Sequence, residues 1–257
     1  MTTLLRLVCL FLSILTVVNA AMFADTVKVW AADEDGPAKY AVSRIATQDG
    51  AVPWSDEAWE RVEPIELRCH MGKTPEHFPR VRAKIAYDTS AIYVAFVVND
   101  RYVRAVAEAH QGAVYCDSCV EFFFTPSEVP TAGYFNLEMN CGGTMLLHFQ
   151  REPRGEFVAL AAEDIARIDV LHDLPRFVQP EIEQPTDWSV AYRLPVDVVA
   201  KYFPGKVAQP RPGVTWRANL YKCADETSHP HWLTWSRVGR PQPDFHRPEW
   251  FGTLVFE

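Results

Sequence analysis

Residues 81–98 read VRAKIAYDTSAIYVAFVV, and this stretch decides the fold class. Residues 81–87 alternate between apolar and polar side chains, which predicts a strand with one exposed face. Residues 92–98 form a continuous β-branched and aromatic run, which predicts a central strand covered on both faces. Because Asp88-Thr89-Ser90 between them favours a tight turn, the stretch predicts a hairpin inside a packed sheet.

Short strand patterns recur on both sides of this hairpin. Only residues 196–202 (VDVVAKY), after Pro195, have a helical pattern. Repeated short strands with turn-rich connections are typical of an all-β fold, and we predict an antiparallel β-sandwich with one or two short helices. The further predicted strands are residues 120–124, 134–140, 144–149, 165–171, 188–194, 215–221 and 253–256.

The N-terminus has the layout of a secretory signal peptide. Arg6 precedes an apolar run over residues 7–18, and small residues up to Ala20 offer a cleavage site. We therefore expect a signal peptide over residues 1–20, one domain over residues 21–257, and a secreted or periplasmic protein. Cleavage after Ala24 and a buried N-terminal helix are the alternatives. No later segment reaches about 20 consecutive apolar residues, so we expect no membrane anchor in the mature chain.

Composition narrows the classes of partner. The chain is 48% hydrophobic and 12% aromatic, which is enough for a large core. Its net charge is −8 and it has no basic run, which argues against nucleic acid and anionic membranes as partners. Neutral sugars are compatible with this charge.

Several segments, read in order, carry a family resemblance. They are DG at 49–50 with Trp54 and DEAW at 56–59, AKIAYD at 83–88 with IYVAF at 92–96, DSCVEFF at 117–123, YFNLEMN at 134–140, WSVAYRLP at 188–195, WRAN at 216–219, Trp235-Ser236, Phe245-His246 with Pro248, and FGTLVF at 251–256. In this order they resemble carbohydrate-binding module family 9, a β-sandwich group related to DOMON domains. The resemblance implies a non-catalytic protein that binds a polysaccharide or oligosaccharide and serves its capture or breakdown.

The resemblance also suggests the binding residues. Tyr115 stands where family members carry a platform Trp, and Trp235 matches a second platform, so the two rings are expected to clamp a sugar. Sugar rings have apolar faces and a rim of hydroxyl groups, so a site needs aromatic platforms and hydrogen-bonding side chains. The expected rim residues are Glu121, Asn136, Glu138, Asn140 and Lys222.

Two departures from the family pattern concern the ligand more than the fold. Tyr192 or Arg193 replaces a family acid, and residues 151–184 carry no family signature.

Strand alternation supports a polar binding face that carries the expected rim residues. Asn136, Glu138 and Asn140 occupy alternate positions and share one face of a strand, whereas the residues between them are apolar. The alternative is an ordinary solvated sheet face. Among the aromatic residues, strand-like context predicts a core position for Trp30, Trp54, Trp59, Trp188 and Trp216, whereas Tyr115, Trp232 and Trp235 stand beside polar loop residues.

The cysteines and histidines offer other chemistry. Cys9 lies in the expected signal peptide, and Cys141 and Cys223 are expected to lie close together, within reach of a disulfide. Cys116-x-x-Cys119 has metal or redox spacing but neither a second Cys pair nor a thioredoxin-like βαβ pattern around it. A transition-metal site could form from His229, His231 and His246, and a structural calcium site from Asp49, Asp56 and Asp88.

The sequence supports an enzymatic function less well than a binding function. The sequence has no Gly-x-Ser-x-Gly, no His-Glu-x-x-His and no phosphate-binding loop. Glu121 with Asp117 or Glu138 could supply the carboxylate pair of a glycoside hydrolase, which is the main alternative. DOMON-like haem binding through Met, His or Lys is a further alternative. We expect a binding protein that is not itself an enzyme and needs no cofactor, with a structural calcium ion as an open alternative.

Overall fold

The predicted hairpin is present in the computed structural model, which describes residues 37–46 and 56–257. β4 (Arg80–Tyr87) pairs antiparallel with β5 (Ala91–Asp100). The Asp88 carboxylate closes the turn by accepting hydrogen bonds from the backbone N–H groups of Ser90 and Ala91, at 2.7 and 2.8 Å. β5 is buried along nearly its whole length, as its apolar run predicts.

β4 is more buried than its alternation predicts. Lys84 stands on the face expected to be exposed, yet it is only 4% exposed. The reason is helix α1 (Asp56–Trp59): Trp59 packs with Ala86 and Ala95 on this face, and Lys84 Nζ donates a hydrogen bond to the Trp59 carbonyl at 2.9 Å.

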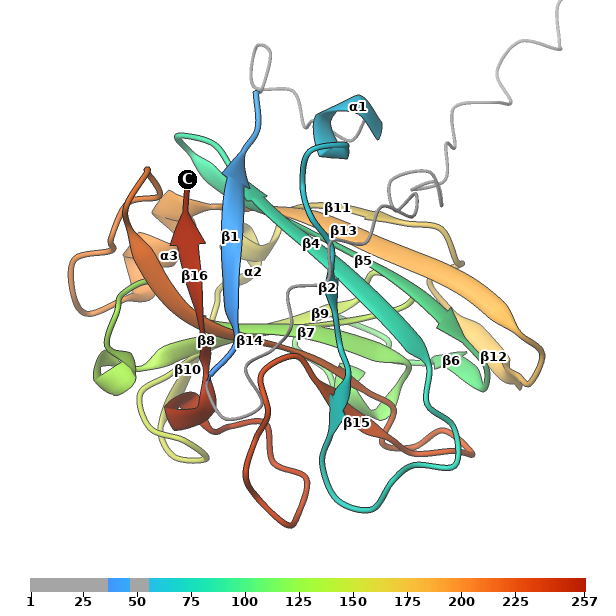
Figure 1. Ribbon diagram of the computed structural model, residues 1–257. Coiled ribbons are helices and arrows are strands. Elements are labelled where there is room, and N and C mark those ends of the chain that lie inside the picture. Colours follow the sequence, from blue (N-terminus) through green and yellow to red (C-terminus); the bar gives the residue numbers. More distant parts are fainter. Residues whose placement is uncertain (1–36, 47–55) are drawn as a thin grey trace, which may run out of the picture.

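The strands form one large curled sheet whose two halves face each other as the layers of a sandwich. β1 (Lys39–Arg44) joins the layers, because it pairs in parallel with β16 on one side and with β4 on the other (Figure 1). The first layer has the order β10 (Phe157–Ala159), β9 (Met145–Gln150), β8 (Tyr134–Asn140), β7 (Cys119–Thr125), β14 (Thr215–Cys223), β16 (Gly252–Phe256). The second has the order β4, β5, β13 (Thr186–Pro195), β11 (Asp169–His172).

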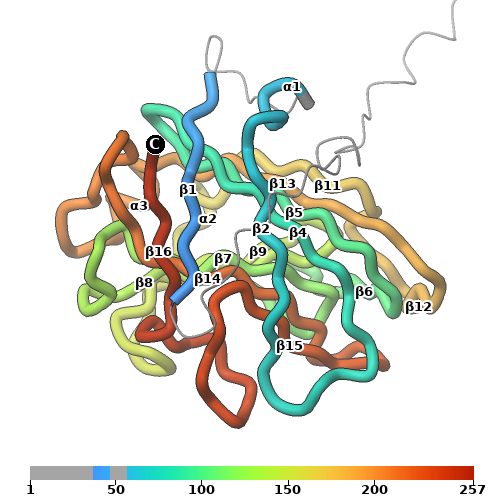
Figure 2. Tube along the Cα trace, in the orientation of Figure 1, coloured from blue at the N-terminus to red at the C-terminus, as the bar shows by residue number. Residues whose placement is uncertain are grey.

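Short elements complete the layers. β15 pairs with β14 and with β3, β2 pairs with β4, and β12 pairs with β6. Their bounds are Ile65–Glu66 for β2, Cys69–His70 for β3, Val103–Ala105 for β6, Val178–Ile182 for β12 and Trp232–Thr234 for β15. Single 3-10 turns lie at Val114–Cys116, Pro130–Ala132 and Pro248–Trp250. The chain trace in Figure 2 shows the C-terminal strand β16 running beside β1.

One helix confirms the prediction from the sequence, and another shows that a predicted strand is wrong. α3 (Val196–Tyr202) begins after Pro195, as predicted. The strand predicted over residues 165–171 is wrong in its first part, where helix α2 (Ala162–Ile165) ends and β11 begins only at Asp169. Asp164 explains the helix, because its carboxylate accepts hydrogen bonds from Lys201 Nζ and the Tyr202 hydroxyl of α3, both at 2.6 Å.

The main core lies between the two layers. Val120, Phe122 and Phe124 of β7 face Val94 and Phe96 of β5 in one buried cluster. The predicted core positions of Trp59, Trp188 and Trp216 are confirmed, with at most 1% of each residue exposed. Trp30, Trp54 and the expected signal peptide lie outside the described residues. No helix in residues 37–46 and 56–257 is long and apolar enough to cross a membrane.

Candidate functional site

The outer face of β7, β8 and β14 carries most of the polar residues singled out by the sequence. Phe122 and Leu137 point to the main core, so Glu121 and Glu138, one position along each strand, point outward. Glu121 and Glu138 are directly opposite each other in the β7–β8 register. A second apolar cluster covers much of this face, and its members include Phe123, Tyr134, Tyr221, Phe245 and Phe251.

Because of this cover, the polar row is buried and does not form an exposed rim. Glu121 and Asn136 are each 2% exposed, Glu138 is 4% exposed and Asn140 is fully buried. The shared face of Asn136, Glu138 and Asn140 is confirmed, but the open hydroxyl rim expected from them is not what the structure shows. Residues 238–251, the segment before β16, supply much of the cover.

The two asparagines have their hydrogen bonds within the protein. Asn136 donates to Glu138 Oε1 and accepts from Gln150 Nε2, both at 2.9 Å. Asn140 donates to Asp117 Oδ2 and accepts from two backbone N–H groups of the turn after β8. Asn140 therefore stabilises the turn after β8 from a fully buried position.

The two glutamates form a buried acidic pair. Burial raises the pKa of Glu138 to about 7, against a hydrogen bond from Asn136 that lowers it. Burial also raises the pKa of Glu121 well above its ordinary value, and the neighbouring Cys223 thiol and Glu138 carboxyl add to this. The second carboxyl oxygen of each residue has no hydrogen-bond partner among the described residues. Two carboxyl groups this close cannot both ionise easily, so the pair retains a proton near neutral pH.

Two aromatic residues flank this pair at the edge of the sheet. Tyr115, in the 3-10 turn before β7, is 42% exposed. Its carbonyl accepts a hydrogen bond from Asp225 N at 3.1 Å, and the Asp225 carboxylate accepts one from Trp232 Nε1 at 2.8 Å. Trp232 is half-buried and opposite Cys223 in the β14–β15 register. Asp225 thus links the exposed tyrosine to the tryptophan.

Trp235 does not lie with Tyr115. Trp235 N donates to Leu220 O, and both side chains pack against the main core. A Cβ at Gly252 would come within 2.9 Å of the Trp235 ring, so this ring lies against β16. The expected pairing of Tyr115 with Trp235 is therefore corrected: Trp235 is three positions after Trp232 along an extended backbone, and this odd spacing points their side chains to opposite faces.

Lys222 also points to the core side, inside a buried charged cluster. Its Nζ lies 2.7 Å from His231 Nε2 and 3.5 Å from Asp100 Oδ2, and both charged side chains are fully buried. Burial would raise the pKa of Asp100, but the Lys222 charge and a hydrogen bond with His77 outweigh it and lower that pKa. Burial and then Lys222 lower the pKa of His231 to about 3, so His231 is neutral and accepts from Lys222. Lys222 therefore stabilises the fold and is not at the rim.

The three histidines do not converge. His231 lies on the core side with Lys222, and His229 stacks on Tyr102 with 3.6 Å between ring centroids. His246 lies on the outer face, where its Nδ1 is 2.7 Å from the Tyr134 hydroxyl. His231 and His246 lie on opposite faces of the sheet and cannot share one ion.

The structure also shows where the cysteines of the expected disulfide and the acids of the expected calcium site lie. Cys141 and Cys223 are free thiols on opposite faces: Cys141 belongs to the main core and Cys223 to the outer cluster, so the disulfide expectation is wrong. Asp88 holds the β4–β5 turn through hydrogen bonds that include one from the Tyr93 hydroxyl. Asp49 and the side chain of Asp56 lie outside the described residues.

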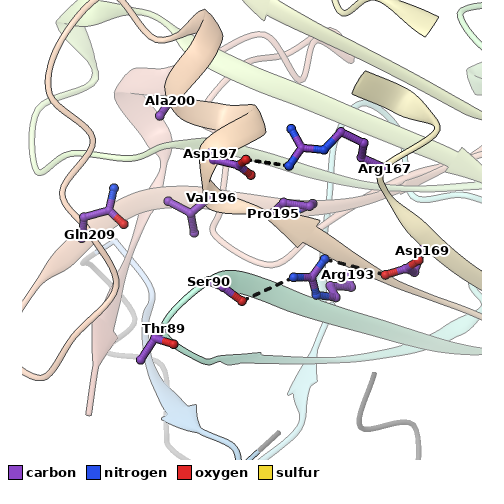
Figure 3. A pocket seen from close by; sticks show the side chains of 10 residues that line it. All are labelled: Thr89, Ser90, Arg167, Asp169, Arg193, Pro195, Val196, Asp197, Ala200 and Gln209. Carbon is purple, nitrogen blue, oxygen red and sulfur yellow. Dashed lines mark hydrogen bonds and ion pairs between the residues drawn. The ribbon is translucent and has the colours of Figure 1, made fainter. Parts of the chain in front are cut away.

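A separate hollow of about 620 Å³ lies beside α3 (Figure 3). It holds two ion pairs, Arg167 with Asp197 at 2.6 Å and Arg193 with Asp169 at 3.7 Å. Its lining residues, all among those described, include no aromatic ring on which a sugar could stack. A smaller hollow lies on the outer-face side, where Arg154 stands beside residues 240–244 and Arg247.

Fold and site together define a β-sandwich with aromatic residues beside polar side chains at one sheet edge, as in sugar-binding modules. The family model of carbohydrate-binding family 9 matches residues 58–256, and the chain belongs to this family. It therefore has a carbohydrate-binding role. A search of curated proteins finds no match.

Solved structures agree with this assignment. A Bacteroides uniformis protein provisionally assigned as carbohydrate-binding has 27% identity and a TM-score of 0.77, over 86% of this chain and 100% of that one. A family 9 module from Caldicellulosiruptor kristjanssonii, in complex with glucose, has 17% identity and a TM-score of 0.52 over 86% and 96%. The cellotriose complex of a module from the same organism has 17% identity and a TM-score of 0.53 over 86% and 94%. At 17% identity these modules show a shared fold.

Sequence reasoning missed Asp225 altogether and did not choose Trp232 as a platform. The signal for Trp232 was its place beside polar loop residues, which Trp235 shares. Only the register of β15 on β14 separates the two rings.

Proposed function

We propose that this chain binds a glucose-containing saccharide without hydrolysing it, at the sheet edge formed by Tyr115, Asp225 and Trp232. The observation that carries the proposal is the Asp225 link between an exposed tyrosine and a half-buried tryptophan. An aromatic face packs against the apolar face of a pyranose, and a carboxylate beside it accepts hydrogen bonds from the hydroxyl groups. Glucose and cellotriose bound to the modules of C. kristjanssonii support this class of ligand.

Charged groups around the aromatic edge suit a polar ligand. Glu226 follows Asp225 and is exposed, and the exposed Arg154 is near enough to lower the pKa of both Asp225 and Glu138. These groups offer both donors and acceptors, which a ring of sugar hydroxyls requires.

The buried carboxyl pair argues for passive binding. Glycoside hydrolysis requires a protonated acid and an ionised carboxylate on either side of the scissile bond. Glu121 and Glu138 are 2% and 4% exposed, so a glycosidic bond has no access to the pair. Their raised pKa values also disfavour the ionised partner that catalysis needs.

Calorimetric titration with cellotriose tests the aromatic edge. Tyr115→Ala and Trp232→Ala should each weaken binding, by up to about a hundredfold if the lost contact is worth a few kcal/mol. Trp250→Ala is the matched control, because Trp250 is 40% exposed and belongs to the 3-10 turn before β16, so affinity should not change. Loss of binding in Trp235→Ala with Trp232→Ala unaffected would refute this assignment and favour a clamp of Tyr115 with Trp235.

A reducing-sugar assay on the same preparation tests the absence of catalysis. We expect no turnover of cello-oligosaccharides by the wild type. Turnover that disappears in Glu121→Gln while cellotriose binding persists would show a hydrolase instead.

We also propose that the protein is exported and acts on polysaccharide outside the cytoplasm. The basic start, apolar run and small residues over residues 1–20 support this. Mass spectrometry of the protein from the periplasm or medium should give a chain that begins at Ala21. An intact chain in the cytoplasmic fraction would contradict export.

A further inference from the structure

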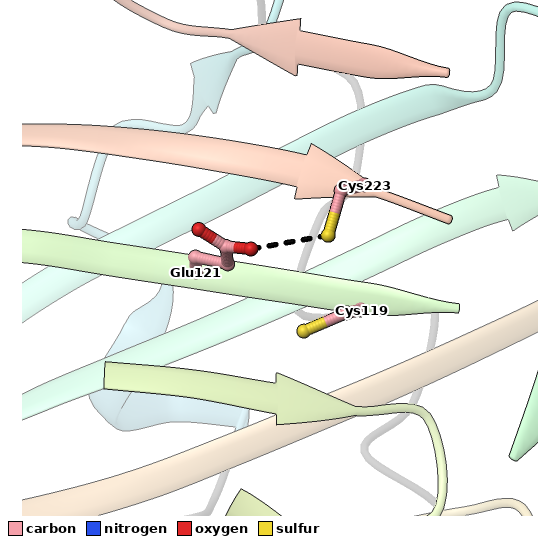
Figure 4. Close-up of side chains that lie close together, drawn as sticks. All are labelled: Cys119, Glu121 and Cys223. Carbon is pink, nitrogen blue, oxygen red and sulfur yellow. Dashed lines mark hydrogen bonds between the residues drawn. The ribbon is translucent and has the colours of Figure 1, made fainter. Parts of the chain in front are cut away.

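Two cysteines and a glutamate from adjacent strands meet on the outer face of the sheet. Cys119 of β7 is directly opposite Cys223 of β14, and Glu121 is two residues further along β7 on the same face. The Cys223 thiol donates a hydrogen bond to Glu121 Oε1 at 3.0 Å (Figure 4). One ligand atom from each of the three residues lies within 4.8 Å of the other two.

These groups are almost fully buried. Cys119 is fully buried, Cys223 is 1% exposed and Glu121 is 2% exposed. Glu121 Oε2 has no hydrogen-bond partner among the described residues, and neither has Glu138 Oε2 on the opposing strand. Buried polar atoms normally have partners, so two unpartnered carboxyl oxygens beside two thiols point to a missing cation.

The donor set selects the kind of cation. Thiolate sulfur with a carboxylate oxygen suits Zn²⁺, whereas Ca²⁺ and Mg²⁺ take oxygen ligands. Tetrahedral zinc needs sulfur at about 2.3 Å and carboxylate oxygen at about 2.0–2.2 Å, which places donor atoms on the order of 3–4 Å apart. The three donor atoms lie within 4.8 Å of one another, so small side-chain rotations bring them to this spacing.

We propose that Cys119, Glu121 and Cys223 bind one zinc ion. Binding releases the two thiol protons, and the proton of the Glu121 carboxyl where it is held, to solvent. The two thiolates then balance the charge of the ion, and the Glu121 carboxylate is the third ligand. Because the thiols must lose their protons to bind the ion, zinc binding should weaken as the pH falls. The proposal does not depend on the proposed function, although Cys223 Sγ also lies 3.5 Å from the Tyr115 carbonyl and links the two sites.

A disulfide between Cys119 and Cys223 is the competing fate. Opposed residues of antiparallel strands have Cα atoms about 4.5–5.5 Å apart, which is within disulfide range. The hydrogen bond from Cys223 to Glu121 and the free carboxyl oxygens favour the ion, since a disulfide leaves these oxygens without partners.

The test uses the full chain, purified under reducing conditions, treated with a chelator and titrated with Zn²⁺ by calorimetry and with Cd²⁺ by thiolate-to-metal absorption. We expect one ion per chain and cadmium–thiolate absorption in the wild type. Cys223→Ser should lower zinc affinity by at least about tenfold, because even the outer partners of metal ligands change affinity by about 10- to 100-fold. Cys141→Ser is the matched control, a buried thiol on the opposite face that should leave zinc binding unchanged.

Other outcomes would overturn the proposal. These are no zinc binding or no cadmium–thiolate absorption in the wild type, equal affinity in Cys223→Ser, or a peptide map that links Cys119 to Cys223 in the purified chain. The wild-type absorption stands as a test even if a variant fails to fold. Cellotriose titration of the same samples separates the two proposals. A protein that binds cellotriose but not zinc would refute only the metal site. A protein that binds zinc but not cellotriose would refute only the proposed function.

Discussion

Glu138→Gln should stabilise the folded protein at alkaline pH, although it removes a charge from a buried site. Gln has nearly the same shape and keeps an oxygen to accept the 2.9 Å hydrogen bond from Asn136. The replaced carboxyl has its pKa raised from 4.5 to about 7, first by burial and further by the charge of Asp225. A carboxyl with a raised folded-state pKa holds its proton more tightly when folded. Its contribution to stability is therefore present below about pH 4.5 and is lost as the pH rises to about 7.

The shift sets the magnitude. The pKa of Glu138 rises from 4.5 to about 7 on folding, and each pKa unit corresponds to about 1.36 kcal/mol. At pH 8 the charged Glu138 therefore lowers the free energy of unfolding by about 3 kcal/mol. The stability of Glu138→Gln relative to wild type should therefore rise by about 3 kcal/mol between pH 4 and pH 8.

Urea unfolding followed by tryptophan fluorescence at both pH values measures this difference. The buffer contains a chelator, so that no divalent cation compensates the carboxylates. Glu249→Gln is the control, since Glu249 is exposed and its replacement should have no comparable pH-dependent effect. A Glu138→Gln protein that is less stable than wild type at pH 8, or a difference that does not change with pH, would refute the buried acidic pair.

Three further predictions concern the buried polar groups. Lys222→Met leaves the Asp100 carboxylate buried without its cation, so the free energy of unfolding in urea should fall by about 3–5 kcal/mol, and a loss below about 1 kcal/mol would speak against this ion pair. Because the pKa of His231 is lowered to about 3, the unfolded state binds its proton first, and wild-type stability should fall from about pH 6.5 towards pH 3. His231→Asn should have a shallower slope over that range, and equal slopes would contradict the neutral histidine. Asp117→Ala removes the acceptor of three hydrogen bonds, including one from Asn140, and should cost about 2–4 kcal/mol in thermal unfolding, whereas an unchanged melting temperature would disprove this role.

The sequence by itself determined the class of fold. The β-branched and aromatic run over residues 92–98, between turn residues, predicts a strand covered on both faces, and this run is β5 between β4 and β13. Alternation within a strand also determined which side chains share a face, as for Asn136, Glu138 and Asn140. These inferences hold because the two-residue period of a strand is a local property of the backbone.

Tertiary structure alone decided what covers each face and which strands are neighbours. The polar row of β8 is buried because Phe245 and Phe251, more than a hundred residues later, pack over its face. Cys119 meets Cys223 because β14 pairs with β7, which no spacing along the chain predicts. Trp232 faces outward and Trp235 faces the core because of the register of β15 on β14. Local periodicity specifies a face, but only long-range pairing and packing determine whether that face meets solvent, core or another strand.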